Sequence, residues 1–260
     1  MKRIFTILIR RDMRKVFNVR TLFIWSAMSM MAVFFFFATS GKTSLLENNK
    51  VEFLALFLAQ VIFGAWAVLS IYFDLISSDR EQNVLDCILC AGISKPVIFL
   101  CKTIAILLTS IILSFIYLAP VTAVIVFLSG TSAHFAVLIQ YLAPLWGYIM
   151  VYAALGMMIS VVARSTKIAL ITCLACGLVL MPRFFLLIVD GLGNVFHWSK
   201  ATIETISLIA PGVMMESLAH YAGTVEYLKM TLVFLASITL LVAFAYFTFC
   251  KQDELNYNEQ

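Results

Sequence analysis

The chain has 260 residues, of which 63% are hydrophobic and only 12% are charged, and its mean hydropathy is +1.01. Soluble domains carry about 25% charged residues, so the composition excludes a soluble domain and predicts an all-α integral membrane protein. The formal net charge of +4 is expected to come from lysines and arginines at the membrane surface, so no nucleic-acid partner is predicted.

Residues 1–19 alternate bulky apolar residues with bases, which is the pattern of an amphipathic helix lying on an anionic membrane surface. The apolar residues can share one helical face, and the bases that fill the rest are Lys2, Arg3, Arg10, Arg11, Arg14 and Lys15. The charged start of a signal peptide is a weaker alternative, because the apolar segment that follows is long enough to span the membrane.

Six apolar segments are predicted to cross the membrane. The first, of about 19 residues, covers about 28 Å as a helix, which is close to the thickness of the hydrocarbon layer. Pro120 is expected to kink or break the third segment, because proline cannot donate a helical hydrogen bond. The predicted spans are residues 21–39, 53–76, 97–128, 137–162, 168–189 and 229–250.

A polar interruption, residues 77–102, separates the second span from the third. Ser78 and Glu81 fit a capping box at a helix start, and Gly92 can end that helix. An apolar stripe at helical spacing lies between them and consists of Val84, Leu85, Ile88 and Leu89. We therefore predict one short amphipathic helix over residues 79–91, across the membrane interface. A surface loop with a single helical turn is the alternative.

The run of residues 81–89, then Gly92-Ile93-Ser94 and Cys101-Lys102, resembles a segment of the ABC-2 type export permeases. That family reads roughly E-x-x-x-G-T-L-E-x-L-L-x-x-P-I-S here, followed by G-K. The sequence departs from it at three places, which are Asn83 for Gly, Gly92 for Pro and Cys101 for Gly. The resemblance implies that residues 1–260 form one transmembrane domain, with an N-terminal elbow helix along the cytosolic surface.

In that family the segment corresponding to residues 79–91 is the coupling helix, which docks on a separate ATP-binding subunit. The resemblance implies that ATP and magnesium are bound by that partner, and no cofactor is expected in this chain. Leu85, Ile88 and Leu89 are expected to anchor the helix, either in a groove on the ATPase or against the chain's own spans. The expected polar contacts come from Glu81 and Asp86.

Residues 190–228 are too polar for a span, but residues 203–215 within them are too apolar for a free loop. Ala210-Pro211-Gly212 breaks this stretch. We predict short helices within residues 195–228 that dip into the outer leaflet before the last span, an arrangement that also resembles ABC-2 permeases.

Asp74 and Arg183 are the candidate residues of a translocation path. A charge within the bilayer costs about 2.5–3.5 kcal/mol on insertion scales, so each is expected to face a partner or water. For Arg183, snorkelling toward the outer headgroups is an equally weighted alternative. No catalytic motif is found in the sequence. Two cysteine pairs, Cys87 with Cys90 and Cys173 with Cys176, have C-x-x-C spacing, but each pair falls within a helical apolar pattern, which favours small apolar filler over a zinc or redox site.

Thirteen lysines and arginines flank one side of the six predicted spans and four flank the other, with Arg183 left aside. The excess predicts that both termini are cytosolic. We expect a multi-pass protein of a bacterial inner membrane, acting as the permease subunit of an ATP-driven exporter. It would pair with a second permease copy or a paralogue. The alternatives are an ion-coupled carrier or channel without an ATPase partner, and an intramembrane enzyme.

Overall fold

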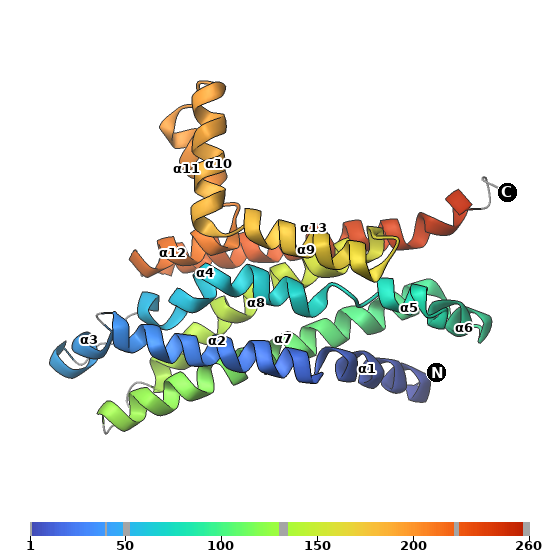
Figure 1. The fold of residues 1–260 in the computed structure, drawn as a ribbon, viewed down its shortest axis with the longest axis horizontal. Coiled ribbons are helices and arrows are strands. Elements are labelled where there is room, and N and C mark those ends of the chain that lie inside the picture. Colours follow the sequence, from blue (N-terminus) through green and yellow to red (C-terminus); the bar gives the residue numbers. More distant parts are fainter. Residues whose placement is uncertain (1, 40, 49–52, 130–134, 221–223, 257–260) are drawn as a thin grey trace.

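A computed structural model shows a bundle of long helices that run roughly parallel or antiparallel to one another (Figure 1). It describes residues 2–39, 41–48, 53–129, 135–220 and 224–256, and these residues form α-helices and connecting turns, with no strand. The helices are α1 (Lys2–Val16), α2 (Val19–Ala38), α3 (Gly41–Asn48), α4 (Phe53–Tyr72), α5 (Ser77–Glu81), α6 (Val84–Cys90), α7 (Lys95–Ser129), α8 (Phe135–Val162), α9 (Thr166–Val179), α10 (Pro182–Val195), α11 (Lys200–Ser207), α12 (Pro211–His220) and α13 (Thr224–Asn256).

Among the described residues, five helical segments are long and apolar enough to cross a membrane. They are Val19–Ala38, Leu56–Glu81, Lys95–Ser129, Tyr141–Val162 and Leu228–Lys251, and the bent pair α9 and α10 could supply a sixth span. The prediction of an all-α membrane protein is therefore confirmed. The second segment continues from α4 into α5, so the start of the predicted amphipathic helix is a continuation of this span.

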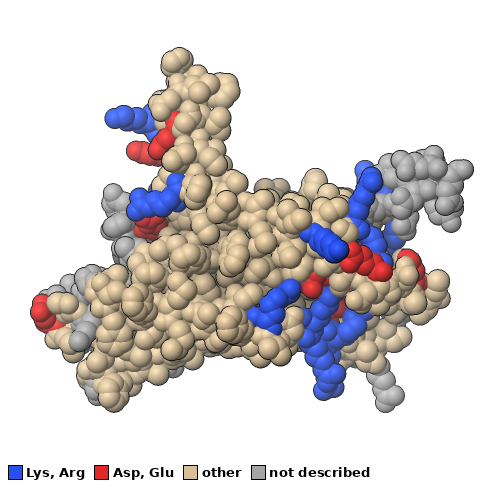
Figure 2. Space-filling model, viewed as in Figure 1, with Lys and Arg blue, Asp and Glu red and all other residues tan. Residues whose placement is uncertain are grey.

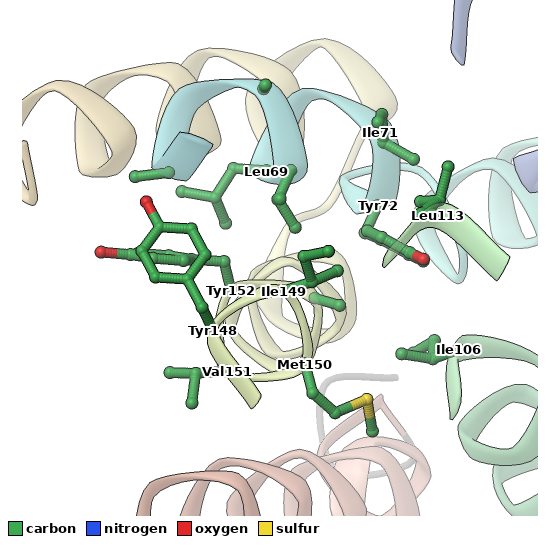
Figure 3. Packing of buried hydrophobic residues seen from close by; sticks show 14 of the residues in the cluster. Leu69, Ile71, Tyr72, Ile106, Leu113, Tyr148, Ile149, Met150, Val151 and Tyr152 are labelled. Carbon is green, nitrogen blue, oxygen red and sulfur yellow. The ribbon is translucent and has the colours of Figure 1, made fainter. Parts of the chain in front are cut away.

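The bundle is built around α4 and α8. Within an apolar stretch of 18 residues, 78% of the residues are buried in the segments that contain α4 and α8. The corresponding share is 33% in α2 and α7 and 17% in α13. Figure 3 shows Tyr148 and Ile149 of α8 packed beside Leu69 and Tyr72 of α4. Helices α2, α7 and α13 surround this pair and turn apolar side chains outward, as lipid-facing helices do.

The predicted fifth span, residues 168–189, is not one straight helix. It consists of α9 and α10, whose axes differ by 72° at the break. Met181 has an extended backbone, with ψ of 134°, and Pro182 occupies the first turn of α10. Proline disfavours a helical conformation in the residue before it, so a new helix begins at Pro182. As a result α10 and α11 project away from the bundle (Figure 1).

Pro120 does not break α7, which continues from Lys95 to Ser129. The missing N–H of Pro120 leaves the carbonyl of Ile116 without its helical donor. Ser29 of α2 points its hydroxyl at this carbonyl, 3.4 Å away, and donates at 3.1 Å to the carbonyl of Tyr117. A neighbouring helix thus supplies the donor that proline lacks, which is how membrane helices tolerate proline.

Candidate functional site

One end of the bundle carries a dense set of charges, and we call it the charged end. It consists of α1, α5, α6, the start of α7 and the turn between α8 and α9. Figure 2 shows lysine and arginine side chains gathered there, and few over the middle of the bundle. Both the polar interruption after the second span and the basic N-terminal helix lie at this end (Figure 1).

The predicted single helix over residues 79–91 is wrong in one respect, because it is two helices. α5 ends at Glu81 and α6 begins at Val84. Asn83 between them has a left-handed backbone, with φ of 54°. Asparagine and glycine adopt this conformation more readily than other residues, which accounts for asparagine where the ABC-2 pattern has glycine. Gly92, at φ of 80°, ends α6 as predicted.

The expected capping box does not form. α5 directly continues the apolar span, its N-cap is Ile76, and no side chain caps it. Asp79 points instead into the protein and is 4% exposed. Glu81 accepts a hydrogen bond from the backbone N–H of Thr166 at 2.8 Å and a second from the Thr166 hydroxyl.

Three cations from two other helices surround the carboxylate of Asp79. The Lys102 ammonium of α7 lies 2.5 Å from it, the Arg11 guanidinium of α1 lies 2.8 Å away, and the Lys15 ammonium of α1 lies 3.2 Å away. Lys102 is completely buried and also donates to the carbonyl of Leu75 at 2.6 Å. Asp79 therefore ties α5 to α1 and α7 through charge-assisted hydrogen bonds.

Asp12 is a second buried carboxylate in this cluster, at 1% exposure. Arg11 donates to it at 2.6 Å, and Lys102 lies 3.6 Å away. Burial lowers the pKa of Arg11, but the neighbouring carboxylates of Asp12 and Asp79 outweigh it, so the net shift is upward. For Lys15 burial prevails, and its pKa is lowered despite the attraction of Asp79.

α5 also forms hydrogen bonds with the end of α8 and with the turn between α8 and α9. Arg80 donates to the carbonyls of Val161 and Ala163, each at 3.1 Å. The hydroxyl of Ser160 accepts from the backbone N–H groups of Ile76 and Ser77, each at 2.9 Å. These two N–H groups lie where α4 gives way to α5, and Ser160 satisfies donors that the change of helix would leave unpaired.

The apolar stripe of α6 packs on the chain's own core. Leu85 is buried, while Ile88 and Leu89 are half-buried against that core. Of the two anchorages expected for this stripe, the structure places it against the chain's own spans. The opposite face of α6 is exposed and carries Asp86, Cys87 and Cys90.

The two candidate residues of a translocation path lie far from each other in the fold. Asp74 lies between α4 and α5, next to the charged end, and Arg20 of α2 lies 3.9 Å from it. The Arg20 guanidinium also lies over the ring of Phe73. Arg183, at the start of α10, is 87% exposed and lies 3.7 Å from Glu216 of α12. The structure does not bring Asp74 and Arg183 into one site.

Sequence reasoning did not assign the buried charges of Asp12, Asp79 and Lys102. The position of Lys102 could have indicated a buried ion pair, because a lysine within an apolar segment requires a partner. Asp12 could have indicated the same, because it is the single acid within a basic helix. Among the residues that the structure describes, no three His, Cys, Asp or Glu side chains are placed to hold a metal ion.

A family model described as "ABC-2 type transporter" matches residues 3–187. The match includes nearly all of α1, the charged cluster, α6 and the helices that follow as far as the first part of α10. No curated protein matched the chain. Because the match covers well over half of the 260 residues, and because the described helices include at least five candidate membrane spans, the chain belongs to the ABC-2 type transporter family and is a multi-pass transporter permease.

Proposed function

We propose that this permease is the membrane subunit of an ATP-driven exporter, and that α5 and α6 transmit work from a separate ATP-binding subunit. The observation that carries the proposal is the position of Asp79. It lies one turn before α6 and is bonded to cations of both α1 and α7. A push on α6 would move the second and third spans together with the basic N-terminal helix.

The exposed face of α6 is the docking surface in this proposal. It offers Asp86, Cys87 and Cys90, while the apolar stripe holds α6 to the bundle. Glu81 contributes from the side, because it bonds Thr166 and so links α5 to α9. ATP and magnesium would be bound by the partner, and the charged end would face the cytosol of a bacterial cell.

We also propose that two permeases, two copies or a pair of paralogues, form the transport unit. Its support is the low burial of α2, α7 and α13 in a single chain. These helices offer apolar surface to lipid and to a second permease alike. Cross-linking of cysteines introduced into exposed positions of α2 and α13, in native membranes, tests which helices meet.

Co-expression with a candidate ATP-binding subunit tests the coupling proposal. Asp86→Arg combined with Cys90→Arg places two large cations on the exposed face of α6. We expect at least a tenfold loss of ATPase co-purification, and no stimulation of ATP hydrolysis by the reconstituted permease. The control is Glu47→Arg, an equally exposed acid on α3 at the other end of the bundle.

Leu85→Asp with Leu89→Asp is a second variant, and it acts differently. It should detach α6 from the core, so ATPase binding falls together with thermal stability. The exposed-face variant should lose binding alone. Undiminished co-purification and ATPase stimulation in the exposed-face variant would mean that α6 is not the docking surface.

A further inference from the structure

A cavity of about 1000 Å³ lies at the end of the bundle opposite the charged end, between α10, α11, α12 and α13. Pockets for drug-sized ligands have volumes of about 300–1,000 Å³, so this one can also hold part of a lipid. The bend between α9 and α10 creates it, because α10 leaves the bundle and carries α11 with it (Figure 1).

The cavity has an apolar floor and a charged rim. Met214 and Met230 line its floor and are 6% and 2% exposed. The side chains of the rim are exposed and comprise two acids and two bases, namely Asp190, Glu204, Lys200 and Lys229. Within the described part of the chain, no ion pair within 4.0 Å joins these acids to these bases. Figure 2 shows both signs of charge on the projecting arm of α10 and α11.

Two features indicate that the rim lies near the level of a membrane surface. The last candidate membrane-spanning segment begins at Leu228, one residue before Lys229. Trp198 also lines the cavity, and tryptophan and lysine are both typical of the zone where lipid headgroups meet the hydrocarbon. A ligand of this cavity would thus have its polar part among headgroups and its apolar part in the bilayer.

We propose that the cavity binds a zwitterionic phospholipid with a primary ammonium group, such as phosphatidylethanolamine. Its phosphate would pair with Lys200 and Lys229, and its ammonium group with Asp190 and Glu204. One acyl chain would lie on the methionine floor, since methionine fits irregular apolar shapes. A rim with two charges of each sign matches a headgroup that carries one of each and has no net charge.

Native mass spectrometry of the purified full-length chain, titrated with single lipids, tests this proposal. We expect phosphatidylethanolamine to bind at least tenfold more tightly than phosphatidylglycerol, which has the phosphate but no ammonium group. Asp190→Asn with Glu204→Gln should abolish this preference and leave phosphatidylglycerol binding within twofold. Lys200→Gln with Lys229→Gln should weaken binding of both lipids at least tenfold. Lys167→Gln, at the charged end, is the matched control and should change neither affinity.

Equal affinity of the unmodified protein for the two lipids overturns the proposal, and this comparison requires no variant. A preference that survives both double substitutions overturns the assignment to this cavity. Location has an independent readout, because an acyl chain brominated near the headgroup should quench Trp198 fluorescence. Quenching that is unchanged in Trp198→Phe, which retains the other three tryptophans, would place the lipid elsewhere.

Discussion

Lys102 is completely buried at the charged end, and two buried carboxylates lie within 4 Å of its ammonium group. Removing one partner of a buried ion pair costs about 3–5 kcal/mol, because the remaining charge loses its compensation. Arg11 and Lys15 would still contact Asp79, so the loss should lie near the lower end of that range. Removing Lys102 should therefore cost more stability than removing an exposed lysine.

We predict that Lys102→Met lowers the unfolding free energy of the detergent-purified protein by about 3 kcal/mol. Adding Asp79→Asn to Lys102→Met should deepen the loss, because Arg11 and Lys15 would then lose the carboxylate that they still contact. Thermal unfolding monitored by circular dichroism measures both effects. Lys167→Met is the control, as that lysine is exposed. Equal stability of Lys102→Met and Lys167→Met would contradict the role given to the buried cluster.

Gln60 presents the opposite situation at the core of the bundle. Its side chain is completely buried in α4, and neither its amide nitrogen nor its amide oxygen has a hydrogen-bond partner in the structure. A buried unpaired polar group costs about 1–3 kcal/mol. Its neighbours include Tyr148, whose hydroxyl donates to the backbone carbonyl of Gln60 rather than to its side chain.

We predict that Gln60→Met raises the unfolding free energy by about 1 kcal/mol, since methionine has a similar shape and no polar group to leave unpaired. Gln82→Met, at an exposed position, should leave stability unchanged. A loss of stability in Gln60→Met would show that the amide has a partner, such as a buried water molecule. If transport falls while stability rises, the amide serves transport.

At the scale of elements, the existence of the helices could be predicted and their breaks could not. Apolar length indicated the long spans, and the stripe of Leu85, Ile88 and Leu89 indicated α6. Two single-residue backbone effects moved the boundaries, the left-handed turn at Asn83 and the extended residue before Pro182. Both residues were visible in the sequence, but their effect depends on which neighbour each helix packs against.

The charged cluster could not be assembled from the sequence, because its members are distant along the chain. Asp79 meets Lys102 across 23 residues, Lys15 across 64 and Arg11 across 68. The local capping-box pattern involves Ser78 and Glu81 and does not indicate where Asp79 points. Only the packing of α1 and α7 against α5 decides that Asp79 turns inward.

The contact between α9 and α4 depends on Gly177. A Cβ atom at this position would lie 3.0 Å from the backbone Cα of Trp66 and 3.3 Å from its backbone nitrogen. Backbone atoms cannot rotate away as the end of a side chain can, so the two helices would have to separate. Gly191 in α10 is the matched position, because a Cβ there meets nothing within 4 Å.

We predict that Gly177→Ala destabilises the protein by about 1–3 kcal/mol, the usual cost of overpacking. Gly191→Ala should be neutral or stabilising by up to about 1 kcal/mol, because alanine favours a helix more than glycine does. Thermal unfolding of the two variants side by side measures the difference. If Gly177→Ala proved as stable as Gly191→Ala, α9 would not pack on α4 as closely as the structure has it.

At the scale of the whole molecule, the two ends of the bundle differ in chemistry. The charged end has a basic helix, a buried ion cluster and the exposed face of α6, whereas the opposite end has an amphipathic cavity below a projecting arm. Lysine and arginine concentrate on the cytosolic side of membrane proteins. This asymmetry supports a cytosolic charged end, and it fits a permease that receives work at one end and meets lipid at the other.

Cysteine labelling in membrane vesicles tests this orientation. Cys87 and Cys90 are exposed on α6, whereas Cys101 and Cys173 are buried. With the other four cysteines replaced by serine or alanine, Cys87 and Cys90 should react with a membrane-impermeant maleimide only in inside-out vesicles. A cysteine introduced at exposed Glu47 of α3, with Cys87 and Cys90 also replaced, should react only in right-side-out vesicles. The reverse pattern would place α6 outside the cell, where no ATP-binding subunit could reach it, and the proposed coupling would then be excluded.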